Sequence, residues 1–210
     1  MHTFLSKFRF DAAKSLHIGV ERECFLTDMS GAIVPMARRV LTHLNNPARY
    51  GYELSACQLE ERVGPCRISE VLDELLENKR KLELVEWFLN FKRLHAEVGP
   101  ETMPLDVYPD PTGRYQEITT RMPRDVLLAA CRIIGTHIHV GMPNPETALR
   151  VYNKVITHSS MLCDEGNGSN GQRLEIYRAV APSCDPQSYK DWPHFRSVAI
   201  ERGFVDDPRR

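Results

Sequence analysis

The stretch Gly135-Thr136-His137-Ile138-His139-Val140-Gly141 has the period-two alternation of a β-strand. Successive side chains of a strand point to opposite faces, so His137 and His139 share one face. Glycine at both ends leaves room for the close approach of a ligand, a metal or another backbone. We therefore predict that this strand belongs to an active site.

Carboxylates alternate in the same way in a segment near the start of the chain, Ile18-Gly19-Val20-Glu21-Arg22-Glu23-Cys24-Phe25. In a strand, Glu21 and Glu23 share one face and Arg22 points to the other. The segment is predicted to be a strand whose acidic face looks toward the two imidazoles.

A second acidic segment is Glu53-Leu54-Ser55-Ala56-Cys57-Gln58-Leu59-Glu60. As one regular strand it places Gln58 and Glu60 on the same face and Glu53 on the other. Glu53 joins them only if a bulge intervenes.

If the three segments converge, the shared face carries Glu21, Glu23, Glu60 and one histidine. Carboxylate oxygens with an imidazole suit Mg²⁺ or Mn²⁺, and without cations such a face repels itself. Metal sites of this kind often hold nucleotide phosphates, which Arg121 or Arg178 would clamp. The sequence has no G-x-x-x-x-G-K-[ST] and no G-x-G-x-x-G motif, so the sheet itself would have to bind the nucleotide.

The bulk composition is that of an ordinary globular protein. The 210 residues are 42% hydrophobic and 26% charged, with a formal net charge of −1. Nucleic acid is not expected as a partner, because its binding requires an excess of basic residues. No signal peptide is recognised, and no apolar run reaches the roughly 20 residues that span a bilayer. We expect a single domain over residues 1–210, located in the cytoplasm.

The six cysteines form no C-x-x-C pair. Reduced and mostly buried thiols are the expected state. An alternative is that Cys24 and Cys57, which lie within the two acidic segments, sense oxidation near the site.

Apolar spacing predicts the helices. One is short, around Arg38 to Leu44, and the longest runs from Ser69 to about Glu97. Its apolar stripe, with residues recurring at three and four, consists of Leu72, Leu75, Leu76, Leu82, Val85, Phe88 and Leu89. Others are expected over residues 125–130 and from Asn144 to about Cys163. The glycine-rich segment 164–171 that follows is typical of a mobile loop, which could cover a ligand. This order of elements predicts an α+β protein, an antiparallel sheet backed by helices.

Taken together, the segments resemble the carboxylate-amine ligase family, the second type of glutamate–cysteine ligase, which shares the fold of glutamine synthetase. The resemblance covers nearly the whole chain with matching order and spacing. It consists of Ile18 through Leu26, Glu53 through Glu60, Tyr115-Gln116, Gly135 through Met142, and Tyr177-Arg178.

The resemblance implies ATP-dependent joining of a γ-carboxylate, typically that of glutamate, to an amine such as that of cysteine, by way of an acyl phosphate. Glutathione biosynthesis would be its setting. The residues carried over are Glu21, Glu23, Glu60 and His137 as cation ligands, His139 as a nucleotide contact with Glu53 and Gln58 as its neighbours, and Arg178 and Arg121 as catalytic arginines. The implied fold is a curved antiparallel sheet with the active site on its concave face.

Two features depart from the family. Its members are usually longer, and a segment following a stretch like residues 203–210 supplies further strands with an acidic and a basic site residue. The chain is then a truncated piece, or a partner chain completes its site, or it is a shortened relative that binds without catalysing. The second departure is Arg22, which lies between Glu21 and Glu23. In members of the family, the residues next to these two glutamates are commonly acidic.

Two rivals to the ligase come from other classes. One is a catalytically silent relative that keeps nucleotide or amino-acid binding. The other is a metallohydrolase built on His137 and His139. The lack of a third histidine or cysteine ligand argues against it. The sequence leaves the amine substrate and the oligomeric state open, a homo-oligomer among the alternatives.

Overall fold

A computed structural model describes residues 2–181 and 185–203 of the chain. In chain order its elements are α1 (His2–Leu5), a 3₁₀ turn (Ala12–Lys14), β1 (Ile18–Thr27), α2 (Ala37–Leu44), β2 (Tyr50–Tyr52), β3 (Gln58–Cys66), a second 3₁₀ turn (Ile68–Glu70), α3 (Val71–Leu89), β4 (Lys92–Leu94), α4 (Arg114–Thr120), α5 (Arg124–Cys131), β5 (Thr136–Val140), α6 (Pro145–Ile156), α7 (Ser159–Glu165), α8 (Gln172–Val180) and α9 (Trp192–Glu201). They form two compact units, the larger comprising residues 17–139 and 168–181. The single domain expected from the sequence stays a prediction.

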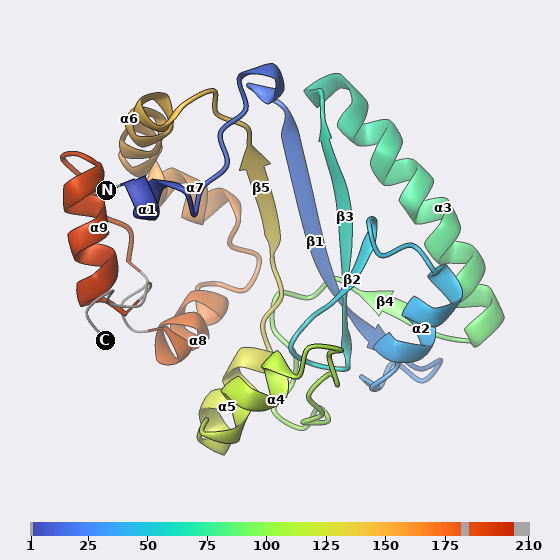
Figure 1. Ribbon diagram of the computed structural model, residues 1–210. Coiled ribbons are helices and arrows are strands. Elements are labelled where there is room, and N and C mark those ends of the chain that lie inside the picture. Colours follow the sequence, from blue (N-terminus) through green and yellow to red (C-terminus); the bar gives the residue numbers. More distant parts are fainter. Residues whose placement is uncertain (1, 182–184, 204–210) are drawn as a thin grey trace. The chain divides into compact units, whose positions relative to one another are not determined.

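The larger unit is built on an open, five-stranded antiparallel sheet of order β2-β3-β1-β4, with β5 also paired to β1 (Figure 1). The register of β1 and β3 sets Glu23 opposite Glu60, and β4 pairs with the last three residues of β1. The backbone N–H of Glu23 donates to the carbonyl of Gly135, which aligns β5 with the first part of β1 (3.0 Å). The predicted α+β class with an antiparallel sheet backed by helices is confirmed.

One face of this sheet is closed by α2 and α3. The alternation of β1 sends Cys24 and Leu26 to this face and the two glutamates to the other, as the sequence predicts. Its cluster of fully buried side chains, each stabilising the fold by roughly 1.5–3 kcal/mol, includes Leu26, Val40, Tyr50, Leu59, Leu82, Leu89 and Phe91. Because the burial of Cys24 and Leu26 fixes which way β1 faces, it also fixes the two glutamates on the other face of the sheet.

The longest helix ends earlier than predicted. Asn90 adopts a left-handed conformation (φ 54°) and its backbone N–H caps the carbonyl of Glu86, which stops α3 at Leu89. Phe91 is then buried and residues 92–94 pair with β1 as β4. The expected continuation to Glu97 is wrong because these residues are more stable as a strand at the edge of the sheet.

The apolar stripe predicted for α3 is buried only in part. Leu82 and Leu89 are buried, whereas Leu72 and Phe88 are 65% and 61% exposed. Spacing by three and four selected too many positions, because the sheet covers a narrower strip of the helix than the apolar residues occupy.

The other predicted helices occur near their expected places. Asn144 caps α6 by accepting a hydrogen bond from the N–H of Thr147 (2.8 Å). The expected continuous helix to Cys163 is split at residues 157–158 into α6 and α7. The helices α8 and α9 were not expected from the sequence.

The smaller unit consists of helices around an aromatic cluster. The edge-to-face contacts of Phe4 with Trp192 and Phe195 hold α1 against α9, with ring centroids 6.4 and 5.6 Å apart. The side-chain amide of Asn153 exchanges two hydrogen bonds with the backbone of Tyr189 (2.7 and 2.9 Å). Within the described ranges, no helix has both the length and the apolar character needed to cross a membrane.

The cysteines are free thiols in the part of the chain that the structure describes, and Cys184 lies outside it. Burial raises the pKa of Cys24 to about 12 and that of Cys57 to about 11. Both therefore stay protonated at neutral pH, and a thiol is a poor nucleophile. Their structure supports the expectation of buried, inert thiols and gives no support to an oxidation sensor.

Candidate metal and nucleotide site

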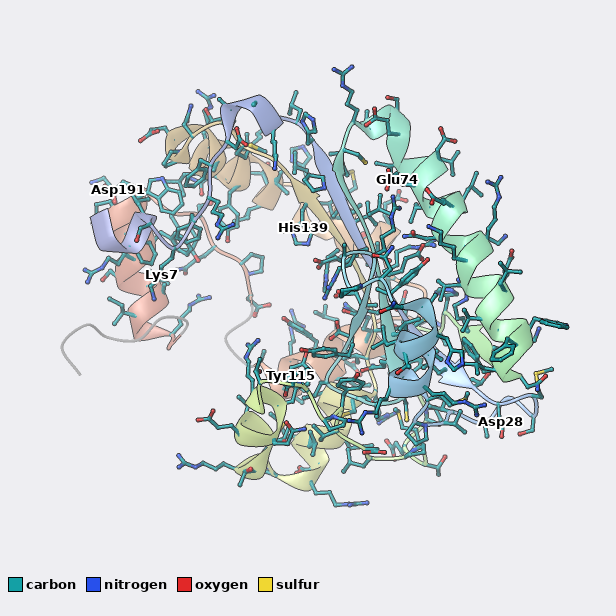
Figure 2. The ribbon with its side chains drawn as sticks, turned by 45° about the vertical axis from the view of Figure 1, so that its right-hand side comes forward. Lys7, Asp28, Glu74, Tyr115, His139 and Asp191 are labelled. Atoms are coloured by element: carbon teal, nitrogen blue, oxygen red, sulfur yellow. The ribbon has the colours of Figure 1, made fainter. Side chains whose placement is uncertain are left out.

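The acidic strand and the histidine strand converge on one face of the sheet. The Nδ1 atom of His137 lies 3.4 Å from Glu21 Oε2 and 3.9 Å from Glu23 Oε1. His139 shares this face, and Figure 2 shows it on the opposite side of the sheet from Glu74 of α3. The shared face predicted from the alternation is confirmed.

Glu53 reaches the same face by a route that the sequence did not suggest. The segment is not one strand, because the chain reverses between β2 and β3, with Ser55 Oγ accepting from the N–H of Cys57 inside the turn (3.1 Å). In the resulting hairpin Gly51 lies opposite Glu60, and Glu53, two residues after Gly51, falls on the face of Glu60. A reversal of the chain, rather than a bulge, brings Glu53 into the site.

Three carboxylates form the centre of the site. One oxygen from each of Glu23, Glu53 and Glu60 lies within 4.8 Å of the others, and this is the one such potential metal-ligand group of the described residues. Burial, a hydrogen bond with Glu60 and the charge of Glu23 raise the pKa of Glu53 to about 9. Glu53 thus holds a proton at neutral pH, and a divalent cation could replace it. An all-oxygen ligand set suits Mg²⁺ or Mn²⁺.

Glu21 lies beside this triplet and faces the imidazoles. His139 Nε2 is 3.0 Å from Glu21 Oε2. Burial works to raise the pKa of Glu21, but the hydrogen bond and charge of His139, with those of His137, outweigh it and hold the pKa below its ordinary value. Glu21 is therefore ionised at neutral pH. The roles of Glu21 and His137 as cation ligands stay predictions.

A permanent positive charge is fixed at Glu60. Arg62 Nε donates to Glu60 Oε1, and the two residues share a face of β3. A Cβ atom at Gly51 would stand 2.5 Å from Arg62 Nη2, so glycine at this position lets the guanidinium lie across β2. Arg62 offsets part of the negative charge that the triplet concentrates.

Arg173, at the start of α8, is the site residue that the sequence did not reveal. Its Nε donates to the carbonyl of Ile134 (2.6 Å), and its Nη2 lies where a side chain at Gly135 would project, 2.6 Å from an added Cβ atom. Its charge also lowers the pKa of Glu23, although burial, the largest effect, leaves that pKa raised overall. Arg173 therefore presents a cation next to the carboxylates. The glycine before the histidine strand was the one sequence signal for it.

The remaining predicted residues lie elsewhere. Gln58 is buried, and its Nε2 donates to the carbonyls of Cys131 and Ile133 (3.0 Å each), which fixes the approach to β5. Arg121 is exposed at the end of α4. Arg178 is exposed on α8, five residues after Arg173, a spacing that does not place two side chains on one helix face. Their binding and catalytic roles stay predictions.

The second half of the glycine-rich segment is fastened to the larger unit. The N–H of Gly168 donates to Glu97 Oε1 (2.5 Å), and the N–H of Arg173 donates to Ser169 Oγ (3.1 Å). Burial works to raise the pKa of Glu97, but hydrogen bonds from Ser169 and Gly168 hold it below the ordinary value. This anchor positions the first turn of α8, and with it Arg173.

The protonated state of Glu53 makes stability depend on pH. Its folded pKa of about 9 exceeds the ordinary 4.5, so its stabilising contribution is complete below 4.5 and is lost as pH rises toward 9. Without divalent cations, the free energy of unfolding should decline across that window, by at most about 1.4 kcal/mol per pH unit. Glu53→Gln should flatten the decline in urea titrations.

The exposed Glu117 of α4 provides a control, and Glu117→Gln should leave the pH dependence of the wild-type chain unchanged. A Glu53→Gln profile as steep as that of the wild type would show that Glu53 does not hold the proton.

Comparison with known proteins identifies relatives along most of the chain. No protein-family model matches it. "Putative glutamate--cysteine ligase 2-1" of Rhodococcus jostii (strain RHA1) is 30% identical over 150 residues, 69% of this chain and 39% of that protein. "Putative glutamate--cysteine ligase 2-2" of Mycobacterium sp. (strain KMS) is 31% identical over 192 residues, 86% and 51% of the two chains. "Putative glutamate--cysteine ligase 2" of Rhodopirellula baltica (strain DSM 10527 / NCIMB 13988 / SH1) is 28% identical over 212 residues, 90% and 54%. The chain spans about half the length of the curated relatives it matches.

Proposed function

The chain belongs to the glutamate–cysteine ligase 2 family, and from this we propose that it carries the metal- and nucleotide-binding face of an ATP-dependent carboxylate–amine ligase. The observation that supports the proposal most is the gathering of Glu23, Glu53 and Glu60 beside two imidazoles on one side of an open sheet. A solvated strand face has no need to bring three partly or fully buried carboxylates together.

Glu23, Glu53 and Glu60 would hold Mg²⁺ or Mn²⁺, with Glu21 and His137 as the nearest further ligands. When bound, the cation supplies charge neutralisation for nucleotide phosphates during phosphoryl transfer. The residues fit a dication, because burial together with the neighbouring carboxylates Glu60 and Glu23 raises the pKa of Glu53, and a dication would favour the ionised form of all three.

The basic side chains of the site would act on the transferred phosphate. Arg173 lies next to Glu23, where a guanidinium can bind phosphate oxygens and the charge that develops on them. His139, hydrogen-bonded to Glu21, would contact the nucleotide from the neighbouring position on β5. Gln58 would act as a positioning residue by holding the backbone before β5. Arg62 would do so by holding the carboxylate of Glu60.

The proposed reaction proceeds in two balanced steps. A γ-carboxylate oxygen, typically of glutamate, attacks the terminal phosphorus of ATP, and ADP leaves with the electron pair of the broken P–O bond. An amine such as that of cysteine then attacks the acyl carbon, loses a proton and expels phosphate as the amide forms. The protein's contribution would be positioning and charge stabilisation.

We further infer that the sheet corresponds to the catalytic sheet of glutamine synthetase-like enzymes. The five-stranded antiparallel arrangement with helices on one face and acidic residues on the other supports this assignment.

Phosphate release from ATP tests the function. With Mg²⁺ and glutamate, and a panel of amino acids that includes cysteine, the wild-type chain should release phosphate in an amine-dependent manner. His137→Ala should abolish most of this release, because His137 contacts both Glu21 and Glu23. His43→Ala, which removes an exposed imidazole from α2, should leave it unchanged.

Nucleotide binding without amine-dependent release would favour a second candidate, a relative that binds without catalysing. The observation behind it is that the chain spans only about half of its relatives. A metallohydrolase built on His137 and His139 has less support, because both imidazoles face Glu21 and the potential metal-ligand group of the described residues consists of carboxylates alone. Zn²⁺-dependent hydrolysis in place of Mg²⁺-dependent release would reverse that judgement.

A further inference from the structure

A second candidate site lies on the other side of β1. A cavity of about 350 Å³ is lined by Arg22, Lys79, Glu86, Arg93 and His95. Arg22 alternates with Glu21 and Glu23 along β1 and so points away from the carboxylate site. Lys79 and Glu86 come from α3. The cavity therefore lies on the α3 side of the sheet, separated from the carboxylates by the thickness of a strand.

The one carboxylate that lines the cavity is already engaged. Glu86 accepts hydrogen bonds from the backbone N–H, Nε and Nη2 of Arg93 (3.0, 2.8 and 3.4 Å). The two side chains are only 14% and 10% exposed. Arg93 is thereby held in one orientation, and Glu86 cannot neutralise the other cations of the cavity.

Two further cations keep donors available for a ligand. The Nε and Nη2 atoms of Arg22 both donate to a single oxygen, Glu61 Oε2 (3.1 and 2.6 Å). Because a guanidinium has five N–H donors, others are left for a ligand. Lys79 Nζ is 3.7 Å from Glu83 Oε1, beyond hydrogen-bond distance, and its side chain is 57% exposed. Guanidinium and ammonium donors of this kind match carboxylate and phosphate oxygens.

Three of the residues that line the cavity, Arg22, Lys79 and Arg93, are cations, and one, Glu86, is an anion. Burial lowers the pKa of His95, and the charges of Arg93 and Arg22 lower it further and outweigh the opposing charge of Glu61. A volume of about 350 Å³ has the size of a small-ligand site. An anion entering it would meet fixed positive charges and an imidazole rather than a solvated surface.

We propose that this cavity binds a compact oxyanion, either a phosphate or a small polycarboxylate, through Arg22, Lys79 and Arg93. The site is distinct from the carboxylate face and does not depend on the function proposed for it. Arg22, which departs from the acidic neighbours usual in the family, acquires a role as an anion ligand.

Titrations of the full chain with inorganic phosphate and, in parallel, with citrate test this proposal, both without divalent cations. The side-chain Nε–H signals of arginine, observed by NMR and assigned by substitution, locate any bound anion. Signals of Arg22 and Arg93 should shift with saturation for one anion or both, which also identifies the ligand class. Lys79→Gln should weaken this binding about fivefold.

Lys81 provides a matched control on the same helix. It pairs with Glu77 at 2.7 Å and does not line the cavity, so Lys81→Gln should preserve the affinity. Both variants remove one exposed charge from α3, and unchanged circular dichroism would exclude unfolding. Equal weakening by the two variants would overturn the proposal in favour of diffuse surface charge. Absence of saturable shifts with both anions, or shifts confined to Arg173, would overturn it as well.

Discussion

Replacing Glu60 by Gln should weaken Mn²⁺ binding by about 100-fold or more, because it removes a charged ligand from the triplet. Glu60 is 5% exposed, and its oxygen lies within 4.8 Å of those of Glu23 and Glu53. The amide of Gln has a similar shape, so the loss reports charge and ligand strength rather than packing. The electron paramagnetic resonance signal of free Mn²⁺ measures the affinity directly.

Glu61 offers a stringent control because it is adjacent in sequence and buried but lies on the opposite face of β3. It pairs with Arg22 at 2.6 Å, so Glu61→Gln disturbs an ion pair of comparable burial. Mn²⁺ affinity should stay close to that of the wild type. If Glu61→Gln weakened binding as much as Glu60→Gln, the metal would not be bound by the triplet.

Arg173→Ala should slow amine-dependent phosphate release by about 10²–10³-fold, as does the loss of one donor to transition-state charge. The reason is its place next to Glu23, with Nε fixed by the carbonyl of Ile134. Mn²⁺ affinity should change little, since Arg173 contributes no ligand oxygen. The measurement is the steady-state rate at saturating ATP and amine.

Arg178 supplies the comparison, because the sequence resemblance selects it as the catalytic arginine, whereas the structure brings Arg173 to the site. Arg178→Ala on the same helix should retain most of the rate. A large loss in Arg178→Ala together with a small one in Arg173→Ala would support the assignment from sequence and contradict the one from structure.

The alternation of side chains was predictable because strand geometry alone determines it. Counting every second residue along the two strands places Glu21, Glu23 and the two histidines on one face. The contacts of His137 and His139 with Glu21 confirm this placement. The buried neighbours Cys24 and Leu26 follow from the same count. These features need no knowledge of distant residues.

Glu53 and Arg173 could not be placed in that way, because their positions depend on how the chain reverses and docks. Whether Glu53 falls on the face of Glu60 is decided by the turn at Ser55, which periodicity does not detect. Arg173 reaches the site only because α8 packs on α5 and Glu97 anchors the preceding glycine-rich segment.

The end of α3 shows a similar competition. Residues 91–97 continue a helical pattern, yet Asn90 breaks the helix and β4 pairs with the end of β1. The hydrogen bonds of a sheet edge and the burial of Phe91 outweigh local helical preference. Secondary structure of this length is decided by tertiary contacts, which the sequence alone does not display.

A crystal of the chain grown with Mn²⁺ tests the central claim most directly, through the anomalous scattering of the metal. The account predicts a peak within ligand distance of the oxygens of Glu23, Glu53 and Glu60, about 2.0–2.6 Å for hard cations. A peak bound instead between the imidazoles of His137 and His139, or no peak on this face at saturating Mn²⁺, would contradict it.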